Sequence, residues 1–561
     1  MKRIVALVLA TSICVSLATS PNANAGRVLD PNLKNLGLHF VENEEVTNIT
    51  SVIYGRVNQD SALDYKICKT ATDSTCDAAT HLFIIQFFSP CVLATDVNCI
   101  EEVFASKDGV KIVGKYQRHF PASGTADYPA EPKMKLPAGK GSSFVVKIPG
   151  VVHEGGSDEY LVALSNKSNI YKKAGESAAN FEIGVNELIG SIAPFEIVAG
   201  NYRAVTVEDG YSSNGGVRLT PSGETCFATE TGTCAAVKNF PEKYQFGMTV
   251  RLSKKLNGWF HGRISTPKVK TSSTEQTYSF TIEAYPVKVA SLDFVVPTSE
   301  LSQEIRDLVF NGKEWGMTGD EKGIKIVAPL DLDLSQTLLK LFTPNFKDTA
   351  TRTSDYWTFY TLGGYRDDPI NKCSNESGSL AGVVTTNSLL YSSGPPTFNK
   401  QESSLDYKVS SPHFESSGKE ATGTYDLLLR SDVARCIYGF TEAPIKASLE
   451  VISSDGTSQI ATTTINEKDG WIYMSASGFG YSAPIVRAKL SQEKSVNNPV
   501  TQASPSPTTS ANAVVTPAPT STQGTSASKS KTKKTITCTK SGSRKKVTAI
   551  NPKCPQGWKK A

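Results

Sequence analysis

The sequence predicts an all-β protein: several antiparallel β-sandwich domains of immunoglobulin-like type in tandem, a disordered linker, and a small disulfide-closed C-terminal hairpin. Apolar and polar residues alternate with the period of two typical of half-buried strands, for example over 110–116, 143–148, 278–284 and 447–453. Dipeptides that favour tight hairpin turns recur between such stretches, at 108–109, 209–210, 257–258, 455–456 and 469–470. The 42 glycines and 29 prolines in 561 residues are ordinary usage, which excludes collagen-like and wholly disordered chains.

The first 25 residues have the organisation of a secretory signal peptide. Lys2 and Arg3 precede an apolar stretch over 4–17, and the segment ends in the small-x-small sequence of residues 23–25. An N-terminal membrane anchor is the alternative, but the apolar stretch is short for one. The longest later apolar run, 82–88, is far below the roughly 20 residues of a membrane helix. We therefore expect a secreted, extracellular, cell-wall-associated protein with no transmembrane segment after cleavage.

Ten cysteines remain after the leader, and in an exported chain they predict disulfides rather than thiolate ligands. Three pairs share a C-x7-C spacing with an Ala-Thr-acid sequence inside, and so short a loop can close across a hairpin or a wide turn. A zinc site would need closer cysteine pairs or neighbouring histidines. The four cysteines of the first two loops allow three connectivities, of which the equal spacing favours local closure. The expected pairs are Cys68–Cys76, Cys91–Cys99, Cys226–Cys234, Cys373–Cys436 and Cys538–Cys554.

Strand pattern and composition divide the chain into seven segments. They are 1–25, the signal peptide; 26–195, a β-domain with two C-x7-C loops; 196–296, a β-domain with the third loop; 297–400, a β-rich region with a short helix; 401–491, an immunoglobulin-like sandwich; 495–528, a Ser/Thr/Pro/Ala-rich linker; and 529–561, a basic hairpin module. The helix is expected over 298–309, where a Ser/Thr start precedes apolar residues at helical spacing. The linker carries no charge and too little apolar surface to offset chain entropy.

Aromatic residues crowd one strand-like stretch of the region 297–400. If exposed beside the acids that follow, they would form a glycan-binding platform, with the rings stacking on sugars. Burial on both faces of an inner strand selects the same residue types and is the favoured interpretation. The residues concerned are Tyr356, Trp357, Tyr360 and Tyr365. Trp259 and Trp471, each next to a turn dipeptide, are predicted to be core anchors.

The sequence contains no signature of a common catalytic site. There is no nucleophile elbow, P-loop, zincin motif or dinucleotide-binding glycine pattern. Asp331 and Asp333 resemble a calcium pair, but their alternation favours the solvent face of a strand. Single histidines are predicted to be surface or satisfied core residues: His39, His81, His119, His153, His261 and His413. We therefore expect no enzyme activity, no cofactor and no metal.

Charge gives the clearest functional signal. From Lys529 onward there are eleven basic residues and no acid; without these and the two cations of the leader, the net charge of +5 becomes −8. The pattern of residues 529–561 predicts a small hairpin, and a module this short needs a disulfide to be stable. We expect it to bind anionic cell-envelope polymers; a tail that only aids solubility is the alternative, and export argues against nucleic acid. The predicted contact residues are Lys540, Arg544, Lys545, Lys546, Lys553, Trp558, Lys559 and Lys560.

The sequence TITCTKSGSRKKVTAINPKCPQGWKK, residues 535–560, resembles a module that follows a Ser/Thr/Pro linker on many secreted actinobacterial proteins of uncharacterised function. The stretches 431–436 and 467–471 resemble a β-rich domain of the same group. This resemblance implies export and an actinobacterial host, and it implies no activity.

Together these features predict an exported, non-enzymatic protein of the cell surface or envelope, retained through its cationic C-terminal module. Its expected partners are anionic envelope polymers or surface glycans. A secreted glycan-binding protein that uses the aromatic stretch is the first alternative. The second alternative is a secreted hydrolase whose site is assembled from residues far apart in the sequence.

Overall fold

The computed structural model confirms the all-β class. It forms two compact units, Met1–Ser495 and Val496–Ala561. The leader 1–25 and the linker 495–528 lie outside the described residues. The described residues are 33–42, 50–56, 65–122, 128–139, 141–185, 187–203, 224–275, 277–310, 318–320, 323–328, 332–362, 369–453, 456–459, 461–481, 485–492, 534–540, 543–549 and 559–560.

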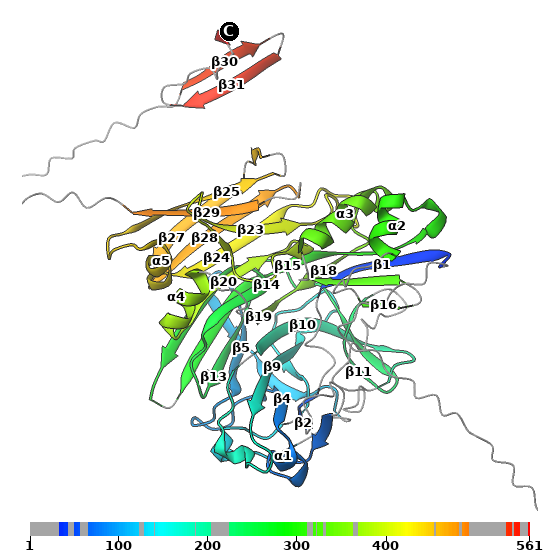
Figure 1. Cartoon of the computed structure of the whole chain (residues 1–561), viewed down its shortest axis with the longest axis vertical. Coiled ribbons are helices and arrows are strands. Elements are labelled where there is room, and N and C mark those ends of the chain that lie inside the picture. Colours follow the sequence, from blue (N-terminus) through cyan, green and yellow to red (C-terminus); the bar gives the residue numbers. More distant parts are fainter. Residues whose placement is uncertain are drawn as a thin grey trace, which may run out of the picture. The chain divides into compact units, whose positions relative to one another are not determined.

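A long sheet runs through the first unit (Figure 1). All neighbours in it are antiparallel except β14 and β20, which are parallel. In spatial order its strands are β3 (Tyr65–Cys68), β2 (Val52–Arg56), β4 (His81–Phe87), β9 (Glu159–Tyr171), β10 (Glu187–Ala199), β19 (Thr358–Leu362), β14 (Gly258–Ser273), β20 (Leu380–Thr386), β24 (Gly423–Arg430), β28 (Trp471–Phe479) and β27 (Thr462–Lys468). Strand β8 (Phe144–Lys147) pairs with the start of β9, and β7 (Lys115–His119) pairs with β8.

A second sheet packs on the first. Its strands are β6 (Val110–Val113), β5 (Cys99–Lys107), β13 (Gln245–Leu252), β15 (Tyr278–Pro297) and the second half of β14. The core between the two sheets contains Phe246, Phe260 and Trp357, all completely buried. Strand β14 passes from one sheet to the other at an irregularity between Ser265 and Lys268, where Pro267 offers no N–H to a ladder.

The far half of β15 carries a third cluster. It pairs with β18 (Arg352–Tyr356) and β1 (Asn35–Glu42), and β1 runs parallel to β17 (Gly323–Ala328), which pairs with β16 (Thr318–Asp320). Helices α2 (Gln303–Phe310) and α3 (Leu332–Phe346) supply Ile305, Leu338 and Phe342 to its core. The helix expected over 298–309 is confirmed by the 3-10 turn η4 (Thr298–Glu300) and α2. The strand expected around Asp333 is wrong, because the apolar residues that follow lie at helical spacing; Asp331 lies outside the described residues.

The C-terminal part of the first unit is a two-sheet sandwich. One layer contains β24, β28 and β27, and its buried face meets a sheet of β21 (Leu390–Tyr391), β22 (Thr397–Asn399), β23 (Ser404–Ser410), β29 (Ile485–Gln492), β25 (Ile445–Ile452) and β26 (Ser458–Gln459). Residues 431–436 form most of helix α5 (Ser431–Tyr438), which the Cys373–Cys436 disulfide links to α4 (Pro369–Ser377).

The domain limits drawn from the sequence fall within continuous structure. The limit 195/196 lies inside β10 and the limit 296/297 inside β15. Strands on either side of 400/401 share a sheet, since β20 pairs with β24. Residues up to 495 cluster as one unit because these long strands pair with several neighbours along their length.

Two predicted turns are confirmed by their backbone. Asp108 and Gly109, between β5 and β6, have φ of 50° and 80°; Asp469 and Gly470, between β27 and β28, have 52° and 78°. Two successive positive φ angles are what a tight hairpin of this kind requires, and Asp-Gly tolerates them. Among the described residues no helix is long and apolar enough to cross a membrane.

The second unit contains a three-stranded antiparallel sheet, with β31 (Ser543–Ala549) and β32 (Lys559–Lys560) on either side of β30 (Lys534–Lys540). The predicted hairpin is therefore present. Cys554 lies outside the described residues, so its bridge to Cys538 stays a prediction.

Candidate functional site

Four of the expected disulfides are present: Cys68–Cys76, Cys91–Cys99, Cys226–Cys234 and Cys373–Cys436. The three C-x7-C loops are nevertheless built in two ways. The third is a β-hairpin of β11 (Cys226–Glu230) and β12 (Thr233–Val237), and the Glu230 carboxylate accepts the N–H of Ala122. The first two close around an aspartate instead.

The loops 68–76 and 91–99 share one local motif. The aspartate five residues after the first cysteine accepts the backbone N–H groups of the two residues that follow that cysteine. Asp73 Oδ2 accepts from Lys69 at 2.6 Å and Thr70 at 3.3 Å. Asp96 Oδ2 accepts from Val92 at 2.8 Å and Leu93 at 2.7 Å. The shared spacing therefore predicts a shared backbone geometry: a disulfide-closed loop in which the aspartate accepts the N–H groups three and four residues before it.

Both aspartates are held in the charged form. The N–H groups of Leu93 and Val92 lower the pKa of Asp96, and the Arg251 cation adds to this. Burial alone would raise the pKa of Asp73, but four backbone N–H groups outweigh it and lower the pKa. Cys68, Asp73 and Cys76 also lie close enough to suggest a metal site. The sulfurs are bonded to each other and the carboxylate serves the N–H groups, so this cluster is a helix cap for α1 (Ser74–Ala78).

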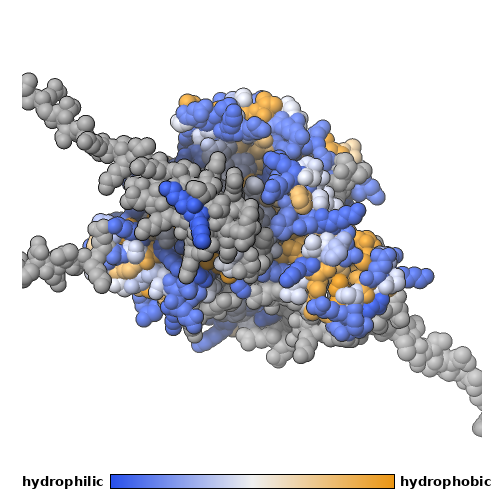
Figure 2. Space-filling model, turned by 90° about the horizontal axis from the view of Figure 1, so that it is seen from above, coloured by the Kyte–Doolittle hydropathy of each residue, from blue (hydrophilic) through white to orange (hydrophobic). Residues whose placement is uncertain are grey.

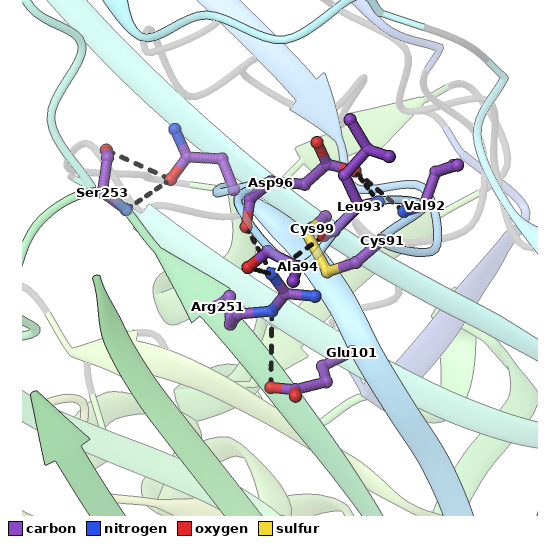
Figure 3. Close-up of a disulfide and its surroundings, with 10 residues drawn as sticks. Cys91, Val92, Leu93, Ala94, Asp96, Cys99, Glu101, Arg251 and Ser253 are labelled. Carbon is purple, nitrogen blue, oxygen red and sulfur yellow. Dashed lines mark hydrogen bonds and ion pairs between the residues drawn. A yellow bond between two sulfur atoms is a disulfide. The ribbon is translucent and has the colours of Figure 1, made fainter. Parts of the chain in front are cut away.

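The 91–99 loop is held from outside as well, by a residue on β13 (Figure 3). Arg251 Nη1 donates to the carbonyl oxygens of Leu93 at 3.1 Å, Ala94 at 2.5 Å and Asp96 at 3.0 Å. Its Nε lies 3.5 Å from the carboxylate of Glu101. The guanidinium supplies a donor to the carbonyl groups of Ala94 and Asp96, and it adds a second donor at Leu93, whose carbonyl also accepts the Asp96 N–H within the loop.

Asn98 ties the same loop to two further segments. Its Nδ2 donates to the carbonyl of Lys135 at 2.9 Å, and its Oδ1 accepts the N–H and hydroxyl of Ser253 at 3.0 and 3.2 Å. Disulfide, aspartate, arginine and asparagine together fix the conformation of nine residues. The loop is therefore preorganised.

This fixed loop exposes apolar side chains. Val92 is 88% exposed and Leu93 61% exposed. Beside the loop lies a cavity of about 470 Å³ with a largely apolar wall, to which Phe87, Pro90, Val97, Leu136 and Pro137 contribute. On the face shown in Figure 2, apolar residues form separate areas bordered by hydrophilic ones. Rigid exposed apolar groups are typical of interaction surfaces, because ordering them on binding costs little entropy.

The aromatic stretch on β18 and β19 does not form an exposed platform. Trp357 is completely buried, and its Nε1 donates to the carbonyl of Ala284 at 3.1 Å. Tyr360 is partly buried, with its hydroxyl 2.6 Å from that of Tyr391. Tyr356 is partly exposed, and Tyr365 lies outside the described residues. The glycan-binding alternative therefore loses its basis here. Trp259 and Trp471, in contrast, are buried as predicted.

A buried polar cluster escaped the sequence analysis. The ring of Tyr391 lies between His261, stacked at 4.0 Å, and the Arg263 guanidinium at 4.2 Å. Arg263 donates to the carbonyls of Thr386, Ser388 and Leu389. Neither ring nitrogen of His261 has a hydrogen-bond partner in the described part of the chain, so the predicted satisfaction of this core histidine is wrong. Burial, with the nearby Arg263 cation, lowers the pKa of His261 far below its usual value.

The other sequence-predicted contacts lie on the second unit. The main-chain register places Arg544 and Lys559 opposite Thr539, one on each side, and Lys545 and Lys560 opposite Cys538 in the same way. In addition, Lys540 is opposite Ser543 and Lys546 is opposite Thr537. Lys559 and Lys560 are exposed. Lys553 and Trp558 lie outside the described residues.

No protein-family model matches the chain, and no curated protein matches it.

Proposed function

We propose that the protein is an exported, non-enzymatic component of the cell surface, and that its C-terminal sheet retains it by binding an anionic polymer of the envelope. The proposal rests on the strand register of that sheet, which places basic residues on neighbouring strands. Export rests on the leader and on the even number of cysteines, which suits an oxidising compartment.

The register concentrates positive charge in a small area. Neighbouring strands lie about 4.8 Å apart, so Arg544 and Lys559 have backbones roughly 10 Å apart across β30. The row two residues along, at Thr537, adds Lys546 to the same face, whereas Lys545 and Lys560 occupy the adjacent row and therefore the opposite face. Three cationic positions on one face, at Arg544, Lys546 and Lys559, match a polymer with repeated negative charges. Like charges this close repel one another, so a polyanion that neutralises them stabilises the sheet.

The test uses the full-length protein and four charge changes in the C-terminal sheet: Lys545→Gln, Lys546→Gln, Lys559→Gln and Lys560→Gln. A matched control removes the same charge from exposed lysines of the first unit: Lys133→Gln, Lys255→Gln, Lys270→Gln and Lys419→Gln. Retention on purified anionic envelope polymer is measured as salt is raised. We expect the first variant to bind at least about tenfold more weakly, since each surface cation contributes up to ~1 kcal/mol near an anionic surface. Equal weakening of both variants would show that only net charge matters and would contradict the proposed site.

Fractionation of the host envelope tests retention directly. A chain without residues 529–561 should move from the envelope fraction to the medium at physiological salt. The full chain should leave the envelope only as salt rises, because exposed charges are screened beyond roughly 8 Å under physiological conditions. A truncated chain that stays with the envelope would contradict retention through this module.

A further inference from the structure

A row of four side chains crosses the end of the long sheet in the first unit. Their backbones are register partners on successive strands: Tyr65 of β3 with Arg56 of β2, Arg56 with His81 of β4, and His81 with Tyr171 of β9. Directly opposed residues in a sheet project to the same face and interact with each other. The row lies where β2 and β9 end and β3 and β4 begin, so its outer member reaches the surface.

Tyr171 is held flat at the end of this row. Its ring stacks on that of His81, with 4.4 Å between centroids and 4° between planes. Tyr171 is 65% exposed whereas His81 is only 6% exposed. Because one face of the tyrosine ring is covered by His81, the exposed area lies mainly on the opposite face and the edge. The ring therefore presents a flat apolar surface to solvent.

The supporting imidazole is itself fixed at both nitrogens. Its Nε2 lies 2.8 Å from Oδ1 of Asn169, and its Nδ1 lies 3.3 Å from the hydroxyl of Tyr65. An amide oxygen only accepts, so Nε2 carries the proton and Nδ1 accepts from the tyrosine hydroxyl. Burial, together with the nearby Arg56 cation, lowers the pKa of His81, so the neutral form that this pattern requires is favoured. The guanidinium of Arg56 lies 5.4 Å from the Tyr65 ring and completes the row.

Asn169 adds polar groups beside the ring. It is exposed, and Oδ1 is engaged by His81. This orients its Nδ2 group away from the imidazole, with two donors for a ligand. An apolar peptide seated on Tyr171 would cover this amide without pairing it, which is unfavourable. A ligand with one apolar face and hydroxyl groups at its rim satisfies both residues.

We propose that Tyr171 and Asn169 form a binding site for a pyranose ring of a polysaccharide. The C–H face of the sugar packs on the exposed face of Tyr171, and a hydroxyl group accepts from Asn169 Nδ2. Rings held in a fixed orientation lose little freedom on binding. One such contact is weak, but a polymer that engages several protein copies on a surface binds with higher avidity. The site belongs to the first unit and is independent of the C-terminal sheet.

The experiment applies the full-length protein to an array of immobilised oligosaccharides of hexoses, hexosamines and hexuronic acids. Binding of at least one class is expected. Tyr171→Ala should reduce it about tenfold, and Tyr171→Phe should retain it, since stacking uses the ring rather than the hydroxyl. Tyr171→Ile keeps a β-favouring apolar side chain against His81 but has no flat face. It should therefore lose saccharide binding to the same extent while the strand stays folded, which separates loss of stacking from loss of folding.

Tyr116 provides the matched control. It is 47% exposed on β7, but its ring contacts only the edge or a tilted face of His119 and Phe144 in the described structure. Tyr116→Ala should therefore leave saccharide binding unchanged. Absence of binding to every saccharide on the array would overturn the proposal, as would equal binding by Tyr171→Ile. Because the C-terminal sheet is intact in all variants, loss of polyanion binding and loss of saccharide binding are separate outcomes.

Discussion

The loops 68–76 and 91–99 have the same closure and opposite surroundings. Each is nine residues long, with a disulfide between its ends and an aspartate that binds the same two backbone N–H groups. In the first loop, Cys68, Ala71 and Cys76 are buried against Ile53 and Leu82, so the closure completes a core.

The second loop turns its apolar residues outward. Val92 and Leu93 are exposed, and Arg251 and Asn98 hold the loop from outside. The same local motif thus stabilises the fold in one place and preorganises a surface in the other. What differs is the partner that the rest of the chain supplies, and each prediction below tests that difference.

The largest effect is expected from removing the disulfides in turn. Chain entropy alone assigns about 2–3 kcal/mol to either loop, because their lengths are equal. Cys68→Ala with Cys76→Ala should lower the free energy of unfolding by about 4 kcal/mol, since it also leaves a cavity in a core. Cys91→Ala with Cys99→Ala should stay near the entropic value. Chemical denaturation measures both, and an equal loss would show that burial contributes nothing.

Arg251→Ala should have the next largest effect. It leaves the carbonyl groups of Ala94 and Asp96 without their donor, removes one of the two donors at Leu93, and should lower the free energy of unfolding by about 1–3 kcal/mol. Amide exchange should accelerate over 92–98 and stay unchanged over 69–75, which hydrogen exchange with mass spectrometry resolves. Arg251→Lys keeps the charge but not the planar fork and should restore only part of the protection. Unchanged exchange over 92–98 would mean that the loop does not depend on Arg251.

Acid titration should separate the two aspartates. Both folded-state pKa values are lowered, so each carboxylate contributes stability that is present above its unfolded pKa of about 3.9 and is lost as pH falls through the folded value. Unfolding midpoints between pH 2 and 6 should therefore depend less on pH in Asp73→Asn and in Asp96→Asn than in the unchanged protein. The effect of Asp73→Asn should be larger, because Asp73 serves more N–H groups and caps α1. A larger effect at Asp96 would reverse the comparison.

The smallest effect is expected at the exposed residues of the 91–99 loop. Val92→Asn and Leu93→Asn should change the free energy of unfolding by less than about 0.5 kcal/mol, as is usual for exposed sites. Ala71→Asn, at the buried counterpart, should cost about 1–3 kcal/mol by placing an amide in an apolar core. Thermal unfolding of the three variants decides this. A large loss of unfolding free energy in Leu93→Asn would show that the Leu93 side chain stabilises the fold and is not part of a free surface.

The sequence predicted the features that depend on near neighbours. Asp108-Gly109 and Asp469-Gly470 adopt their turns because the required φ angles are a property of those residues themselves. Local disulfides follow from spacing, since eight residues of separation leave few other partners within reach. The helix near 303 follows from a short apolar pattern in the same way, and the hairpin at 534–549 follows from two strand-like segments on either side of a short polar turn. The helix over 332–346 was missed because two alternating aspartates outweighed the apolar spacing after them.

Only the tertiary structure decided which residues face solvent and which segments meet. Arg251 closes a loop about 155 residues earlier, and Tyr171 stacks on His81 from a strand 90 residues away. Trp357 is buried because the residue between β18 and β19 faces the core between the two sheets, and β10 and β15 run through the limits drawn at 195/196 and 296/297. Alternation of apolar and polar residues along a strand indicates that one face is buried, but it does not indicate which segment packs on that face. By itself the sequence determined the strands, turns and local disulfides, because these depend on short-range sterics and spacing. The choice between a buried loop and an exposed one depended on which strands became neighbours.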